Sequence, residues 1–145
     1  MSEDFKKNLD LALGNVKRLS NKILIDGKLV SAKSLNKIKV VNPSTGEQIG
    51  EAPQCDKLDV DVAVSSAETA FHKWKKIPAR ERGKMMTAAA RKLEERRDEI
   101  ETLLALDTGN ALRTQAKPET AASIELTHMF AGLAGEIKGE NYPPN

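Results

Sequence analysis

The 145-residue chain has little of several residue types on which common protein functions depend. Its single cysteine, Cys55, excludes an internal disulfide and a zinc site made of cysteines alone. Aromatic residues make up only 3% of the chain, which leaves few large side chains to fill a core. No apolar run approaches the roughly 20 residues that span a bilayer, and the early Glu3 and Asp4 argue against a transit peptide. We therefore expect a cytoplasmic protein with no membrane partner.

An excess of charge of either sign is also missing. Lys and Arg number 23, Asp and Glu number 21, and the formal net charge is +2. Proteins that bind nucleic acid usually carry a clear basic excess, with aromatic side chains among the basic ones for base stacking. The chain has neither feature, so we expect no nucleic-acid partner.

Recognisable catalytic motifs are absent as well. The phosphate-binding patterns GxGxxG and GxxxxGK[ST] do not occur. Cys55 has no glycine-rich turn after it and no evident histidine partner, so an inert loop thiol is favoured over a nucleophile. His72 and His128 lack the spacing of metal ligands. The residues alone therefore indicate no assembled active site.

What the chain does contain is a β-rich segment between helical ones. Residues 1–20 space their apolar side chains as in a helix; a marginal N-terminal helix and a partly disordered arm both fit, and we favour the helix. Residues 21–55 alternate short β runs with turn residues, including Asp26-Gly27 and Asn42-Pro43. Two-stranded ribbons are marginal alone, so this β-hairpin arm should pair with another surface.

Residues 56–145 predict three amphipathic helices and no strand. Their expected limits are Asp59 (as N-cap) to Lys76, Pro78 to Gly109 as one long helix, and Pro118 to Gly139, followed by an extended tail. The mixed-charge run from Lys92 to Glu99 should face solvent. The third helix should bury Ala122, Leu126, Met129, Phe130, Leu133 and Ile137, with Gly132 and Gly135 allowing close packing. Because these helices have no sheet to cover, we expect an isolated chain of marginal stability.

Asp107 is the residue that most suggests a binding site. It lies near the predicted C-terminus of the second helix, where the helix dipole already concentrates negative charge. One interpretation is an exposed acid that costs a few tenths of a kcal/mol. The other is an oxygen ligand for a hard cation. The residues alone favour the first.

Seven short segments, in this order, resemble the N-terminal region of the aldehyde dehydrogenase superfamily. No single segment is specific to this superfamily. The occurrence of all seven in this order between Ile23 and Pro143 is specific to it. The segments are Leu24-Ile25-Asp26-Gly27-Lys28-Leu29-Val30, Val41-Asn42-Pro43-Ser44-Thr45-Gly46-Glu47, Asp61-Val62-Ala63-Val64, Ala70-Phe71-His72-Lys73-Trp74, Pro78-Ala79-Arg80-Glu81-Arg82, Leu106-Asp107-Thr108-Gly109-Asn110 and Phe130-Ala131-Gly132-Leu133-Ala134 with Gly139-Glu140.

The resemblance implies an α/β, aldehyde dehydrogenase-like fold, of which this chain is a mainly helical part with an N-terminal β-hairpin arm. Residues 56–145 would be the helical start of a truncated dinucleotide-binding domain, and the arm would help to join subunits. It also implies NAD(P)-dependent oxidation of an aldehyde to a carboxylic acid. The family's catalytic cysteine, general-base glutamate and cofactor motifs would all follow residue 145. Ala122 and Leu126 would lie near the substrate entrance.

One family site falls inside the chain. Several members bind a structural potassium or sodium ion through the two residues before Asn-Pro and the acid of the (Glu/Asp)-Thr-Gly motif. The resemblance places these ligands at Val40, Val41 and Asp107, in a site that needs at least one further ligand from elsewhere.

The leading hypothesis is an N-terminal fragment of an NAD(P)-dependent aldehyde dehydrogenase that does not catalyse the reaction by itself. The alternative is an interaction module that docks on a full-length dehydrogenase or on a complementary fragment. Partners would be further copies of the chain or a complementary dehydrogenase chain. An unrelated helical domain is the third option.

Overall fold

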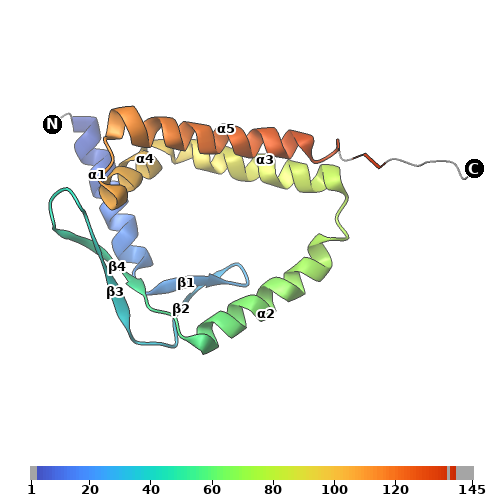
Figure 1. Cartoon of the computed structure of the whole chain (residues 1–145), viewed down its shortest axis with the longest axis horizontal. Coiled ribbons are helices and arrows are strands. Elements are labelled where there is room, and N and C mark those ends of the chain that lie inside the picture. Colours follow the sequence, from blue (N-terminus) through green and yellow to red (C-terminus); the bar gives the residue numbers. More distant parts are fainter. Residues whose placement is uncertain (1–2, 137, 140–145) are drawn as a thin grey trace, which may run out of the picture.

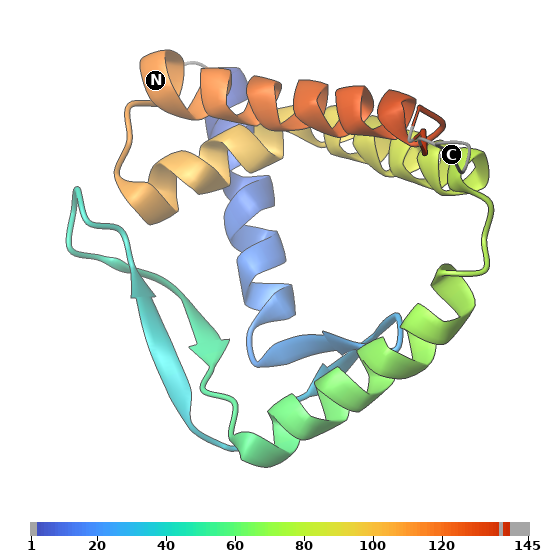
Figure 2. The same ribbon diagram turned by 45° about the vertical axis from the view of Figure 1, so that its right-hand side comes forward.

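The computed structural model describes residues 3–136 and 138–139 (Figure 1). The elements are α1 (Glu3–Leu19), β1 (Lys22–Ile25), β2 (Lys28–Ser31), β3 (Lys37–Val41), β4 (Gln48–Pro53), α2 (Lys57–Trp74), α3 (Ala79–Glu95), α4 (Arg97–Thr108), the π-helical turn η1 (Leu112–Ala116) and α5 (Lys117–Leu133). Helices α3 and α5 run side by side along one edge of the molecule, and α2 lies along the opposite edge (Figures 1 and 2). Helix α1 extends between these two edges.

The β-hairpin arm forms as predicted. Strands β1 and β2 pair antiparallel with Ile25 opposite Lys28, so that only Asp26 and Gly27 make the turn. Both turn residues have positive φ, 51° and 69°, which is the geometry that Asp-Gly accepts in a two-residue hairpin. Strands β3 and β4 form a second antiparallel ribbon, and the two ribbons stay separate two-stranded sheets.

The N-terminal helix is confirmed as α1, whereas the N-cap predicted for α2 is wrong. Asp56 caps α2 and Asp59 is the third helical residue, with each side chain accepting a hydrogen bond from the other's backbone N–H. The Asp59 carboxylate is buried because it also accepts from the backbone N–H groups of Lys33, at 2.8 Å, and Ser34, at 3.3 Å. Asp59 thus ties the start of α2 to the loop between the two ribbons.

The single long helix predicted from Pro78 to Gly109 is also wrong. The chain breaks at Arg96, where φ is −112° and ψ is 18°, and continues as α4. The break allows Arg96 to bond the Glu99 carboxylate while Glu99 turns toward α1. Glu99, expected on a solvated face, is therefore buried. Helical periodicity could not reveal this turn because a paired carboxylate, not an apolar residue, lies on the buried side.

Helix α5 is shorter than predicted and buries a different face. It ends at Leu133 and is preceded by η1, for which no element was predicted. Thr120, Ile124 and Ala131 are buried, whereas most of the expected core residues are exposed: Ala122, Leu126, Met129, Phe130 and Leu133. Ile137 and the tail at 140–145 lie outside the described residues.

Small residues decide how α3 and α5 approach each other. A Cβ at Gly83 would lie 2.6 Å from the Ala131 carbonyl oxygen, so the α3 backbone contacts α5 directly. Gly135 is close to the Arg80 side chain, at 3.3 Å from its Cγ, but Gly132 faces open space. Close packing was thus predicted correctly for Gly135 and wrongly for Gly132.

The core of the described residues is small. Its buried apolar residues are Ala12, Ala32, Ala90, Ala116, Ile124 and Ala131, and no large side chain among the described residues is fully buried. Large apolar side chains lie instead on the exposed faces of α2 and α5. Because burying apolar area is the main favourable contribution to folding, these contacts favour only marginal stability for the chain alone.

Candidate functional site

The C-terminal end of α4 carries uncompensated negative charge. The helix stops at Gly109, which has a φ of 74° and donates its N–H to the Ala105 carbonyl at 3.0 Å. The last turn contains no basic residue. The Asp107 side chain is exposed and makes no hydrogen bond or ion pair within the part of the chain that the structure describes. A carboxylate beside the negative end of a helix dipole favours a nearby cation.

Two of the three predicted cation ligands line the same surface cavity. Val40 and Asp107 both contribute to it, together with the apolar residues Val16, Ile49, Ile100, Leu103 and Leu104. Val41, the third predicted ligand, does not line this cavity. Because the other side chains are apolar, the oxygen donors available here are the Asp107 carboxylate and backbone carbonyls.

A β-bulge disturbs the ladder where the predicted carbonyl ligands lie. Val40 pairs with Gly50 and Val41 pairs with Gln48, so Ile49 is an extra residue in β4. A bulge leaves backbone groups out of the ladder and bends the strand. A carboxylate and strand carbonyls form the oxygen donor set that hard cations prefer. An ion held by these oxygen donors would need further ligands from elsewhere.

The turn between β3 and β4 brings the two halves of this candidate site together. A Cβ at Gly109 would lie 2.8 Å from Pro43 Cγ and 3.1 Å from Ser44 Oγ. Only glycine accepts both this contact and the positive φ. The end of α4 and the end of β3 are thus held next to each other by backbone geometry.

Two other carboxylates on α4 are buried but fully paired. Glu99 accepts from Asn15 Nδ2 at 2.7 Å and from the Arg96 guanidinium at 2.6 Å, and Arg96 holds the pKa of Glu99 below its usual value despite burial. Glu101 accepts from Arg97 Nε at 2.7 Å and lies 3.9 Å from Lys117 Nζ. Paired in this way, both groups stabilise the packing of α4 and offer no free acid or base. Helical spacing placed Glu99 in solvent, so its burial was missed.

The remaining candidate residues form no catalytic group. Cys55 is an exposed free thiol. His72 is exposed beside the Phe71 ring, and His128 Nε2 lies 3.7 Å from Glu94 Oε1. The described residues contain no group of three or more His, Cys, Asp or Glu side chains that could hold a metal ion.

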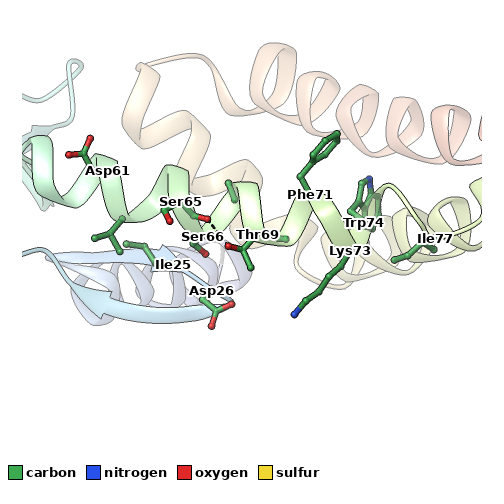
Figure 3. A pocket seen from close by; sticks show the side chains of 13 residues that line it. Ile25, Asp26, Asp61, Ser65, Ser66, Thr69, Phe71, Lys73, Trp74 and Ile77 are labelled. Atoms are coloured by element: carbon green, nitrogen blue, oxygen red, sulfur yellow. Dashed lines mark hydrogen bonds between the residues drawn. The ribbon is translucent and has the colours of Figure 1, made fainter.

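An open apolar groove of about 1130 Å³ runs along α2. Its wall is made mostly by α2, with Ile25 and Asp26 contributed by the β1–β2 hairpin (Figure 3). Phe71 and Trp74 lie along it with exposed fractions of 55% and 40%. Polar side chains also line the groove, namely those of Asp26, Asp61, Ser65, Ser66, Thr69 and Lys73. Because the groove is open and mostly apolar, it has the character of a contact surface.

Comparison with known proteins identifies the family. A sequence model described as "Aldehyde dehydrogenase family" matches residues 29–145, which is most of the chain. The chain belongs to the aldehyde dehydrogenase family. This match confirms the resemblance found in the ordered motifs, and residues 1–28, which include α1, precede it.

Similar proteins are much longer than this chain. It is 33% identical over 130 residues to human cytosolic 10-formyltetrahydrofolate dehydrogenase, covering 88% of this chain and 14% of that protein. Betaine aldehyde dehydrogenase from Staphylococcus aureus, solved in complex with NAD+, has a TM-score of 0.83 at 31% identity, covering 92% of this chain and 27% of the other. HpcC from Thermus thermophilus has a TM-score of 0.89 at 24% identity. The match covers 96% of this chain and 27% of HpcC and shows the shared fold.

These structural matches confirm the aldehyde dehydrogenase fold and the mainly helical character of this part of it. Among the described residues, no helix is both long and apolar enough to cross a membrane.

Proposed function

We propose that the chain is the N-terminal part of an NAD(P)-dependent aldehyde dehydrogenase and does not oxidise aldehydes by itself. Family membership supports the activity of the intact protein. The observation against catalysis by the 145 residues alone is the state of their reactive side chains. The one cysteine lies exposed in a loop, and the buried carboxylates of α4 are already paired with arginines. The intact dehydrogenase would be cytoplasmic and oligomeric, as the sequence predicts.

The cofactor of the intact activity would be NAD or NADP. NAD is favoured because a similar Staphylococcus aureus enzyme was solved with NAD+. The residues of this chain do not fit a dinucleotide, since they offer no glycine-rich phosphate loop. The cofactor would therefore bind to a part of the dehydrogenase outside these residues.

A monovalent cation, potassium or sodium, is proposed at the end of α4. Asp107 would supply a carboxylate oxygen, and Val40 and Val41 would supply backbone carbonyls. The uncompensated charge at Asp107 and the bulge beside Val40 support this assignment. When bound, the ion would neutralise Asp107 and join β3 to α4, a structural role.

The test of the leading proposal is the purified 145-residue chain incubated with a panel of aldehydes and either NAD+ or NADP+. No reduced cofactor should form. The same assay after addition of a separately expressed C-terminal remainder of a family member should recover dehydrogenase activity. Aldehyde-dependent reduction by the chain alone would contradict the proposal.

The second candidate function is an interaction module that docks on a full-length dehydrogenase or a complementary fragment. The uncovered apolar side chains of α2 and α5 favour it, since they would gain a covering surface from a partner. Co-purification of the chain with a family member would support docking. A monomeric chain that unfolds cooperatively and binds no dehydrogenase would count against it.

A further inference from the structure

Helix α1 precedes the residues that match the family model, yet it contacts both halves of the candidate cation site. Helix α4 and strand β4 are both among its neighbours.

The contact with α4 is polar and anchored. Asn15 Nδ2 donates to Glu99 Oε1 at 2.7 Å, and the same carboxylate is held by Arg96. One turn earlier, Ala12 is completely buried. A buried, charge-assisted hydrogen bond has a narrow range of favourable geometries, so it fixes α1 relative to the start of α4.

The contact with the ribbon is made at the strand position that faces Val40. Gly50 pairs with Val40 across the ribbon, and a Cβ at Gly50 would collide with Val16 Cγ1. Ser20 Oγ adds a hydrogen bond to the Glu51 carbonyl at 3.4 Å. A valine in a helix has little χ1 freedom, so the Val16 side chain cannot easily rotate away from its contact with β4.

Val16 also lines the cavity that Val40 and Asp107 share. We propose that α1 is a positioning element of the cation site, in which Asn15 and Val16 hold the β3–β4 ribbon at a set distance from Asp107. This inference rests on the cation site proposed above. Without α1, the ribbon would meet α4 mainly where Pro43 and Ser44 contact Gly109.

The test measures distance and cation response separately. Spin labels at Glu47→Cys on the ribbon turn and Asp98→Cys on α4, in a Cys55→Ser background, report how the ribbon sits relative to α4. Thermal unfolding in potassium chloride and in choline chloride at equal ionic strength reports cation binding. The variants are Asn15→Ala combined with Val16→Ala, Lys17→Ala as a control on the exposed side of α1, and Asp107→Ala.

The unaltered chain and Lys17→Ala should give a narrow distance distribution and a potassium-dependent rise in Tm. The double variant should broaden the distribution and weaken apparent potassium affinity about tenfold or more. Asp107→Ala should lose the potassium response with its distances unchanged. If the double variant does not fold, Asn15→Ala alone gives the same comparison.

An unchanged distance and potassium response in the folded α1 variant would overturn this inference and leave the cation site standing. Because the cation site takes further ligands from elsewhere, the potassium measurement is repeated with a complementary dehydrogenase fragment bound. The absence of any potassium response in that unaltered complex would overturn the cation site and the inference together.

Discussion

Helices α2 and α4 are both tied down by a carboxylate in their first turn, but only α4 is held at its other end as well. Glu99 joins α4 to α1, and Gly109 brings the end of α4 against Pro43. Asp59 joins α2 to Lys33, yet every residue from 67 to 76 is exposed. A buried carboxylate therefore holds the start of each helix, and contact with the turn between β3 and β4 holds the far end of α4 alone.

The exposed end of α2 is apolar, which has an energetic consequence. Covering a Phe or Trp side chain contributes roughly 1.5–3 kcal/mol or somewhat more. Only part of this free energy is gained within the described residues, because Phe71 and Trp74 are about half covered, and the rest remains available for association with a partner.

The largest expected effect is at the end of α4 where Gly109 contacts Pro43. Gly109→Ala would impose a left-handed conformation on alanine and push its Cβ into Pro43, so the free energy of unfolding should fall by about 3 kcal/mol. Chemical denaturation followed by circular dichroism measures this. Gly132→Ala is the matched control: it meets nothing within 4 Å and should be neutral or stabilising. Equal effects for the two variants would remove the distinction between the helix ends.

The second largest effect concerns the anchor at the start of α4. Glu99→Ala removes three hydrogen bonds and leaves Asn15 without its partner, which should cost about 2 kcal/mol. Denaturation of this variant beside Glu95→Ala, whose pair with Lys92 is exposed, should show a loss below about 0.5 kcal/mol for the control. Similar losses for both would mean that burial of Glu99 contributes nothing.

The third prediction concerns the pH dependence of the hydrogen bonds by which Asp59 holds the start of α2 to the loop at Lys33. Backbone N–H groups, chiefly that of Lys33, lower the pKa of Asp59 below its ordinary value. A lowered folded pKa adds stability above the unfolded pKa of about 3.9, and this stability is lost as the pH falls through the folded value. The fluorescence of Trp74, the only tryptophan, should therefore report loosening of α2 below about pH 4.

Asp59→Asn should make that acid transition shallower, because the titrating carboxylate is gone. Asp61→Asn, on the exposed side of the same helix, should leave the transition as it is. An Asp59→Asn profile that coincides with the unaltered chain would show that Asp59 does not anchor α2.

The smallest effect on stability is expected at the free end of α2. Phe71→Ser combined with Trp74→Ser should lower the free energy of unfolding by about 1 kcal/mol, since both side chains are only partly covered. Binding to a complementary dehydrogenase fragment should fall at least tenfold, measured by titration calorimetry. Glu68→Ser, on the same helix but outside the groove lining, should alter neither quantity. A large loss of stability would show that this end of α2 is covered in solution.

Local chemistry allowed much of the chain to be predicted without a structure. Asp26-Gly27 can close a two-residue hairpin because both residues accept positive φ, and Gly109 can end a helix for the same reason. The ordered motifs predicted the family, which the sequence comparison confirms. The shared cavity of Val40 and Asp107 agrees with the candidate site, whose ion remains a prediction.

Contacts between distant segments decided the rest. The buried Glu99 is paired with Asn15, 84 positions away, and the buried Asp59 is paired with the loop at Lys33. The buried face of α5 follows from the approach of Gly83 to Ala131. Periodicity identifies an apolar side of a helix, but a partner must cover that side for it to be buried. Sequence by itself therefore determined the tight turns, the helix stop at Gly109 and the family, whereas tertiary structure decided which faces are inside, because burial is a property of pairs of segments.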